Sequence, residues 1–158
     1  MRIARAGEWY ASLSRSEEVY AMRLIAYLNY DGRCREAFDA YRDALGGEIV
    51  MRFTYGESPM RDDMPPESHG MIMHCQLDVG NAVLMGADGP PPHTASGQGT
   101  CVNIDVDGIE EAERIYAALS EGGTVQMPLQ ETFWAHRWAS FVDRFGKPWM
   151  INCMKTPE

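Results

Sequence analysis

The chain has 158 residues, of which 45% are hydrophobic and 23% are charged, as in one globular domain of ordinary size. Its 23 acidic residues outnumber the 14 lysines and arginines, which gives a net charge of −9. Nucleic acids and anionic membrane surfaces require a basic face, so the charge argues against both as partners. No apolar run reaches the roughly 20 residues needed to span a bilayer.

The four cysteines, Cys34, Cys75, Cys101 and Cys153, form no CxxC motif and follow no regular spacing. The sequence shows neither the charged n-region nor the apolar h-region of a secretory signal. We therefore expect four reduced thiols in a cytoplasmic protein. A zinc site built from these cysteines is the weakly supported alternative.

The periodicity predicts two similar units after an N-terminal extension, residues 1–21, that has no sustained period. We interpret 22–158 as one domain. Helices are predicted at 34–45 and 109–121, the second with a capping pattern from Asp107 to Glu110. Strands are predicted at 22–30, 48–55, 71–79, 82–87, 101–106, 124–127, 138–142 and 148–153.

The two units, about 22–89 and 100–155, can be aligned with one small indel at most. Asp31-Gly32 before the first helix corresponds to Asp107-Gly108 before the second, and Gly46-Gly47 after it corresponds to Gly122-Gly123. Each copy reads as strand, helix and three strands, so its single helix covers one face of its sheet. We predict an α+β fold in which two tandem βαβββ modules form an open half-barrel.

Several segments carry a family resemblance: YLNYDG, EAFDAY, ALGGE, MIMHCQL, LSEGGTV and above all MPLQETFWAHRW…FVDRFGKPWMIN. From about Met22 to Lys155 the chain resembles the vicinal oxygen chelate superfamily, which contains glyoxalase I, extradiol dioxygenases and bleomycin-resistance proteins. It is most similar to the PhnB-like group, also called 3-demethylubiquinone methyltransferase-like. It departs from that group at Ala135 and Ala139, where glycine is usual. The resemblance implies a glyoxalase-like homodimer with a small-molecule ligand.

The resemblance also implies a divalent metal held by His, Gln or Glu at symmetric places in the two repeats. Those places are approximately Ile25, Leu84 or Met85, Cys101 and Met150. Aliphatic and thioether side chains are poor ligands for such cations, and one thiolate does not make a site. We therefore expect no metal and no other cofactor. The glycine-rich turn of a doubly wound fold for S-adenosylmethionine is absent from the sequence as well.

Strand alternation assigns polar side chains to the sheet faces that the helices leave open. Asp105 falls on the same face as its neighbour Asn103. An aromatic loop, Phe133–Arg137, is expected beside this face. The candidate ligand-binding residues are Tyr27, Asn29, His74, Gln76, Asn103, Phe133, Trp134, Arg137 and Asn152.

Three of these residues have a second interpretation. His74 is either a general base or ligand partner, or a half-buried strand histidine bonded to Gln76 or the backbone. Arg137 either clamps a carboxylate or phosphonate, or pairs with Glu131 or Asp143. Trp134 either covers the ligand or packs in the core or a subunit contact.

Three functions follow. The preferred one is a metal-free protein that binds a small organic ligand. The alternative is a lyase or isomerase of the glyoxalase type, either metal-dependent or using His74 and Arg137 in acid–base catalysis. A third hypothesis gives the aromatic loop an assembly role as a dimer contact.

Overall fold

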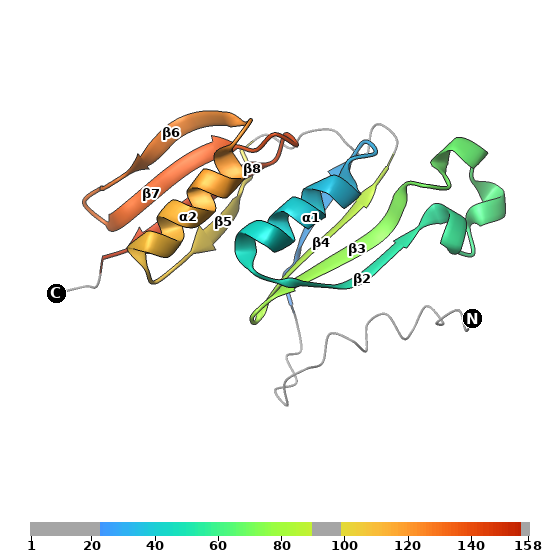
Figure 1. Cartoon of the computed structure of the whole chain (residues 1–158), viewed down its shortest axis with the longest axis horizontal. Coiled ribbons are helices and arrows are strands. Elements are labelled where there is room, and N and C mark those ends of the chain that lie inside the picture. The colour runs from blue at the N-terminus through green and yellow to red at the C-terminus, as the bar shows by residue number, and fades with distance from the viewer. Residues whose placement is uncertain (1–22, 90–98, 156–158) are drawn as a thin grey trace.

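The structure is a computed structural model that describes residues 23–89 and 99–155 (Figure 1). The predicted extension, residues 1–21, lies outside the described residues. The first module contains β1 (Ala26–Tyr30), α1 (Cys34–Leu45), β2 (Glu48–Thr54), β3 (Ile72–Val79) and β4 (Ala82–Asp88). Three short 3-10 helices, η2 (Tyr55–Glu57), η3 (Arg61–Asp63) and η4 (Pro66–Ser68), connect β2 to β3. The second module contains β5 (Val102–Asp105), α2 (Ile109–Ser120), β6 (Thr124–Gln130), β7 (Ala135–Val142) and β8 (Pro148–Met154).

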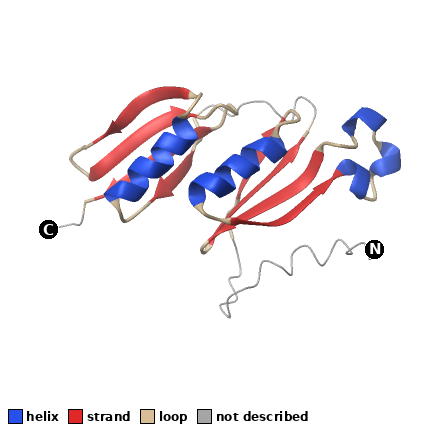
Figure 2. Ribbon diagram, in the orientation of Figure 1, coloured by secondary structure: helices blue, strands red, loops and turns tan. Residues whose placement is uncertain are grey.

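Each module forms its own four-stranded sheet with the same topology. The strand orders are β1-β4-β3-β2 and β5-β8-β7-β6. The first strand pairs in parallel with the last one, and the other pairs are antiparallel. One helix lies on each sheet, and both helices face the viewer in Figure 2. The α+β fold of two tandem βαβββ modules is therefore confirmed.

The main errors of the sequence prediction concern the first residues of two strands and the residue that caps the second helix. β1 starts at Ala26 rather than at residue 22, and β7 starts at Ala135, so most of the predicted aromatic loop is strand. A β-bulge between Ala135 and Arg137 interrupts the alternation that would have indicated this strand. The expected cap at Asp107 does not form, because Gly108 occupies the N-cap position.

The Gly-Gly pair of each repeat has the same structural role in both modules. The first glycine takes a left-handed conformation after the helix, with φ of 74° at Gly46 and 71° at Gly122. A Cβ on the second glycine would collide with a carbonyl oxygen, that of Asp78 for Gly47 and that of Val142 for Gly123. Side chains are therefore excluded at both second positions, which accounts for the repeated motif.

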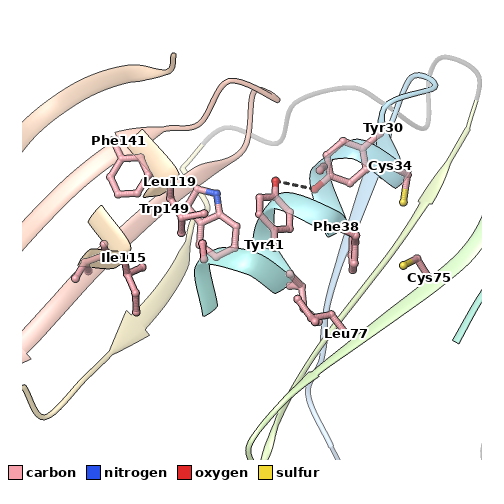
Figure 3. Close-up of a cluster of buried hydrophobic side chains, with 14 of the residues drawn as sticks. Tyr30, Cys34, Phe38, Tyr41, Cys75, Leu77, Ile115, Leu119, Phe141 and Trp149 are labelled. Atoms are coloured by element: carbon pink, nitrogen blue, oxygen red, sulfur yellow. Dashed lines mark hydrogen bonds between the residues drawn. The ribbon is translucent and has the colours of Figure 1, made fainter. Parts of the chain in front are cut away.

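The helices bury their apolar sides in a core that runs through both modules (Figure 3). Tyr41 of α1 reaches Trp149 of β8, with the two ring centroids 5.1 Å apart. The buried residues of α1 are Cys34, Ala37, Phe38, Tyr41 and Ala44, and those of α2 are Ala112, Ile115 and Leu119. No helix among the described residues is both long and apolar enough to cross a membrane.

The carboxylate of Asp143, in the turn between β7 and β8, joins the two modules. Its Oδ2 accepts hydrogen bonds from the Tyr41 hydroxyl at 2.6 Å and the Trp149 indole at 2.8 Å. Its Oδ1 accepts from the backbone N–H groups of Phe145 and Lys147, both at 2.9 Å. Asp143 is only 4% exposed, so these four donors replace the water that a carboxylate would otherwise bind.

Asp88 has a corresponding role inside the first module. Its Oδ1 accepts from the backbone N–H of Cys34, the first residue of α1, at 2.9 Å. Its Oδ2 accepts from the N–H of Ile72, the first residue of β3, at 2.8 Å. One buried side chain thus fixes the start of the helix against two strands.

The Asp143 network gives a prediction about stability. Asp143→Asn replaces one of the two acceptor oxygens by an NH2 group. This group cannot accept the two hydrogen bonds that the lost oxygen received, either from Tyr41 and Trp149 or from the turn. We expect the free energy of unfolding to fall by about 3 kcal/mol. Asp62→Asn, an identical change at an exposed residue, should alter it by less than about 0.5 kcal/mol. Urea unfolding of the unmodified protein and of the two variants measures both effects. Equal losses of unfolding free energy in the two variants would contradict the role of Asp143.

The buried tyrosines predict a loss of stability at alkaline pH. Burial raises the pKa of Tyr41 and of Tyr30 well above the ordinary value of 10.0. The unfolded chain therefore releases these protons first, so their contribution to stability is complete below pH 10 and declines above it. Each tyrosine contributes a slope of roughly 1.4 kcal/mol per pH unit in that range.

Tyr41→Phe should reduce this alkaline slope by the share of one tyrosine, in urea unfolding repeated at increasing pH. Trp149→Phe is the control, because it removes a neighbouring hydrogen bond to Asp143 without removing a titrating proton. The two variants should both be less stable at neutral pH. An unchanged slope in Tyr41→Phe would contradict the prediction.

Candidate functional site

Each sheet has one face that its helix does not cover, and the strand register places the candidate residues on these faces. In the first sheet Tyr27 lies beside Met85, and Met85 lies beside Gln76. The neighbouring row contains Phe53 beside His74. Core residues such as Leu28, Cys75 and Leu77 alternate with them on the helix side. We call this surface, formed by Tyr27, Asn29, Phe53, His74, Gln76 and Met85, the first open face.

His74 and Tyr27 form the polar centre of the first open face. The Tyr27 hydroxyl lies 3.1 Å from His74 Nδ1, and Phe53 lies on the other side of the imidazole with ring centroids 6.0 Å apart. Burial lowers the pKa of His74, so the neutral ring is favoured. Burial also raises the pKa of Tyr27 to about 12, so the phenol keeps its proton at neutral pH. When this phenol donates to Nδ1, the His74 proton resides on Nε2.

The two other candidates on the first open face, Gln76 and Asn29, are partly or fully buried and hydrogen-bonded within the protein. Gln76 is 1% exposed, and its side-chain amide donates to Asp78 Oδ1 at 2.8 Å. Asn29 is partly buried near the junction of the modules, and its carbonyl accepts from Lys147 Nζ. The expected hydrogen bond between His74 and Gln76 is replaced by the bond to Tyr27.

On the second sheet, the corresponding surface carries a chain of polar side chains. Asn152 Nδ2 donates to Asn103 Oδ1 at 2.6 Å, and Asn103 Nδ2 donates to Asp105 Oδ1 at 3.1 Å. Trp138, Asn152 and Asp105 are register partners on β7, β8 and β5. We call this surface, formed by Asn103, Asp105, Trp138, Ser140, Met150 and Asn152, the second open face.

Three aromatic rings extend from the second open face toward the start of β7. Trp134 packs edge-on against Trp138 at 5.7 Å between centroids, and Phe133 packs edge-on against Trp134 at 4.7 Å. Phe133 is 90% exposed. The structure therefore connects Phe133 and Trp134 to the second open face through Trp138, the register partner of Asn152.

Arg137 is not brought to either open face. Its guanidinium Nε donates to Glu113 of α2 at 2.9 Å, so the side chain lies on the helix side of the sheet. The sequence offered Glu131 or Asp143 as ion-pair partners, and the structure differs on both. Lys155 pairs with Glu131, and Asp143 is occupied by the donors described above. Arg137 alternates with Trp138 in β7 and so shares the helix side with Ala139 and Phe141, whereas the sequence prediction placed it in a loop.

The positions implied for a divalent metal do not provide suitable ligands. Leu84 faces the core, so Met85 is the residue of β4 on the first open face, and it neighbours Tyr27. Met150 has the equivalent place on the second open face beside Asn103. Thioethers bind hard and borderline divalent cations poorly. Within 23–89 and 99–155, no group of three or more His, Cys, Asp and Glu side chains could hold a metal ion.

Six members of these surfaces were missing from the candidates chosen from the sequence: Phe53, Met85, Asp105, Trp138, Ser140 and Met150. Trp138 was assigned to a strand but not to the site, and Phe53 was assigned only to the second predicted strand. The signal that could identify them is the register, since Trp138 lies opposite Asn152 and Phe53 opposite His74. All four cysteines are free in the structure.

Comparison with known proteins gives consistent results. The model of the Glyoxalase/Bleomycin resistance protein/Dioxygenase superfamily matches residues 24–151. Protein YjdN of Escherichia coli K12 is 34% identical over 142 residues, covering 85% of this chain and 97% of YjdN. The crystal structure of protein PA1353 from Pseudomonas aeruginosa has a TM-score of 0.77 at 42% identity, covering 86% of this chain and 100% of that one.

A Bacillus cereus structure titled as a putative 3-demethylubiquinone-9 3-methyltransferase, PhnB protein, has a TM-score of 0.70. It is 20% identical and covers 83% of this chain and 98% of its own, so this likeness concerns the fold alone. The family match spans most of both modules. The chain therefore belongs to the glyoxalase/bleomycin resistance protein/dioxygenase superfamily, with PhnB-like proteins among its structural neighbours.

Proposed function

We propose that the protein is a cytoplasmic homodimer that binds a small organic ligand on its open sheet faces without a divalent metal. The observation that supports this most strongly is the polar chain Asn152–Asn103–Asp105 beside Trp138 on the second open face. Convergent polar groups next to aromatic rings are the usual composition of a small-molecule site.

The direction of the hydrogen bonds in this chain indicates which ligand groups it accepts. An ionised aspartate only accepts hydrogen bonds, so Asn103 must turn its amide N–H toward Asp105 and its oxygen toward Asn152. Asn152 must then donate to Asn103, which leaves the Asn152 oxygen free to accept. The available groups at the two ends are therefore a carbonyl oxygen and a carboxylate.

A ligand that fits these ends carries hydrogen-bond donors and a positive charge. Asp105 takes part in no ion pair among the described residues, so its charge is available to such a group. The indole of Trp138 and its neighbour Trp134 add aromatic surface that attracts cations. The net charge of −9 favours the same class of ligand. We therefore propose an aromatic or alkyl amine as the ligand class.

A second function, acid–base catalysis, is favoured by one observation, the Tyr27–His74 pair on the first open face. The low pKa of His74 is suited to a neutral base. However, a Tyr27 proton donated to Nδ1 leaves Nε2 as a hydrogen-bond donor, and Arg137 is held by Glu113 on the other side of its sheet. We therefore favour ligand binding over catalysis at His74.

The ligand class is tested by titrating the intrinsic tryptophan fluorescence with three compounds of similar size. Protonated phenethylamine should bind more tightly than neutral phenethyl alcohol, and phenylacetate should bind least. Asp105→Asn should weaken amine binding roughly tenfold, the value of a charge-assisted hydrogen bond. Asp107→Asn removes the same charge two residues away, beyond the end of β5, and should have little effect.

Preferential binding of phenylacetate, or equal losses in the two aspartate variants, would overturn the proposed ligand class. Equal amine affinity in Asp105→Asn and the unmodified protein would place any binding elsewhere. Circular dichroism of each variant confirms that the comparison concerns folded protein.

The homodimer is supported by large apolar side chains exposed on or beside the open faces. Tyr27 is 45% exposed, Met127 42% and Phe133 90%. Exposed apolar groups gathered on one surface are typical of protein interfaces. Sedimentation at micromolar concentration should give the mass of a dimer.

Phe133→Asp should raise the dimer dissociation constant roughly tenfold or more, because a buried phenylalanine contributes about 2 kcal/mol. Met60→Asp is the control, since Met60 is 42% exposed and lies before η3, outside both sheets. A monomeric mass for the unmodified protein would contradict the proposal.

A further inference from the structure

Two cysteines of the first module lie together where α1 packs on β3. Cys34 is the first residue of α1, and Cys75 is the fourth residue of β3. Both are 0% exposed. Figure 3 shows the two sulfur atoms turned toward each other across the boundary between the helix and the sheet. Neither thiol has a part in the proposed ligand site.

A partly buried guanidinium, that of Arg52, belongs to the residue paired with Cys75 across the sheet. Arg52 of β2 is the register partner of Cys75, and its Nη2 is held by Asp39 of α1 at 2.6 Å. Its Nε is buried and has no hydrogen-bonded nitrogen or oxygen partner. A buried guanidinium N–H requires an acceptor, and the neighbouring sulfur of Cys75 can supply one as a thiolate.

The surroundings shift the pKa values of the two thiols in opposite directions. Hydrogen bonding with the Cys34 thiol, assisted by the Arg52 guanidinium, holds the pKa of Cys75 below its usual range. The same partner and burial raise the pKa of Cys34. Cys75 is thus the thiol of the pair that ionises more readily, and Cys34 the one that keeps its proton. A thiol with a lowered pKa next to a second thiol can be oxidised to a disulfide once an oxidant reaches it.

The other two cysteines, Cys101 and Cys153, lie in different surroundings. Cys101 is exposed and precedes β5. Cys153 is buried, and its Sγ lies 3.6 Å from the carbonyl oxygen of Asp107, to which it donates. They serve as internal controls for the reactivity of the pair.

We propose that Cys34 and Cys75 form an oxidisable dithiol site that reacts with hydrogen peroxide to give a disulfide between α1 and β3. In the first step the Cys75 thiolate attacks one peroxide oxygen, the O–O bond breaks, and a sulfenic acid and hydroxide form. In the second step the Cys34 sulfur attacks the Cys75 sulfur, and the sulfenic oxygen leaves as water with the Cys34 proton. Two thiols are oxidised and one peroxide is reduced to two waters, since the hydroxide of the first step takes up the proton that the Cys75 thiol released on ionisation.

The disulfide would act close to the first open face. Cys75 lies between His74 and Gln76, whose side chains point to the opposite side of β3. The backbone N–H of Cys34 is already fixed by Asp88. The bond would therefore tie β3 to a rigid helix start directly behind His74.

The experiment treats the full-length protein with hydrogen peroxide and maps cysteine-containing peptides by mass spectrometry without reduction. We expect one peptide pair linked through Cys34 and Cys75, lighter by two hydrogen atoms than its reduced form and lost on addition of dithiothreitol. Cys34→Ser should stop at a sulfenic or sulfinic acid on Cys75. Cys153→Ser should still form the linked pair. Ligand titrations are not needed, so the outcome is independent of the proposed function.

The contribution of Arg52 is tested by the rate of the reaction at different pH values. In Arg52→Met the thiolate loses its cation, so oxidation should slow at neutral pH and its rate should rise only at higher pH. Circular dichroism and continued protection of the buried Cys153 from alkylation check that this variant stays folded. Oxidation confined to Cys101, or Cys75 sulfinic acid without any linked peptide in the unmodified protein, would overturn the proposal.

Discussion

The architecture depends on a single buried carboxylate, that of Asp143. Its Oδ2 holds Tyr41 of the first module and Trp149 of the second, while its Oδ1 fixes the turn between β7 and β8. An uncompensated carboxylate in this position would be costly, so the four donors must be present together. This interaction holds the helix-covered sides of the two modules against each other. The opposite sides of both sheets are consequently left available for ligand or partner.

This arrangement lets the two modules diverge in chemistry while they keep one fold. Tyr27 and Asn103 occupy equivalent places on β1 and β5, each beside a methionine of the last strand. The first has become part of an aromatic cluster with His74, and the second part of an amide and carboxylate chain. The Gly-Gly pairs and the helix faces could not diverge in this way, because backbone collisions and the shared core constrain them.

The sequence was sufficient to predict the modules and most of the open faces, because alternation and helical spacing are local properties. Tyr27, His74, Asn103 and Asn152 lie on the faces that alternation assigns to them. Arg137 was misplaced because its segment was interpreted as a loop, whereas β7 begins at Ala135 and turns Arg137 to the side opposite Trp138. Asp143 was considered only as a possible ion-pair partner of Arg137, since its actual partner Tyr41 lies 102 positions away in the chain. Contacts at that separation leave no periodic trace in one sequence.

The absence of suitable metal ligands is compatible with this fold for a physical reason. A metal at the positions of Met85 and Met150 would lie on the open faces, outside the core that Asp88, Asp143 and the helices organise. Replacing its ligands by methionine removes charge from a surface without leaving a buried polar group unpaired, so stability does not require the metal. The hydrogen-bonded side chains around Asn103 and Tyr27 can then orient a ligand themselves. Membership of the superfamily therefore fixes the geometry of the faces but leaves their chemistry to the side chains of this particular chain.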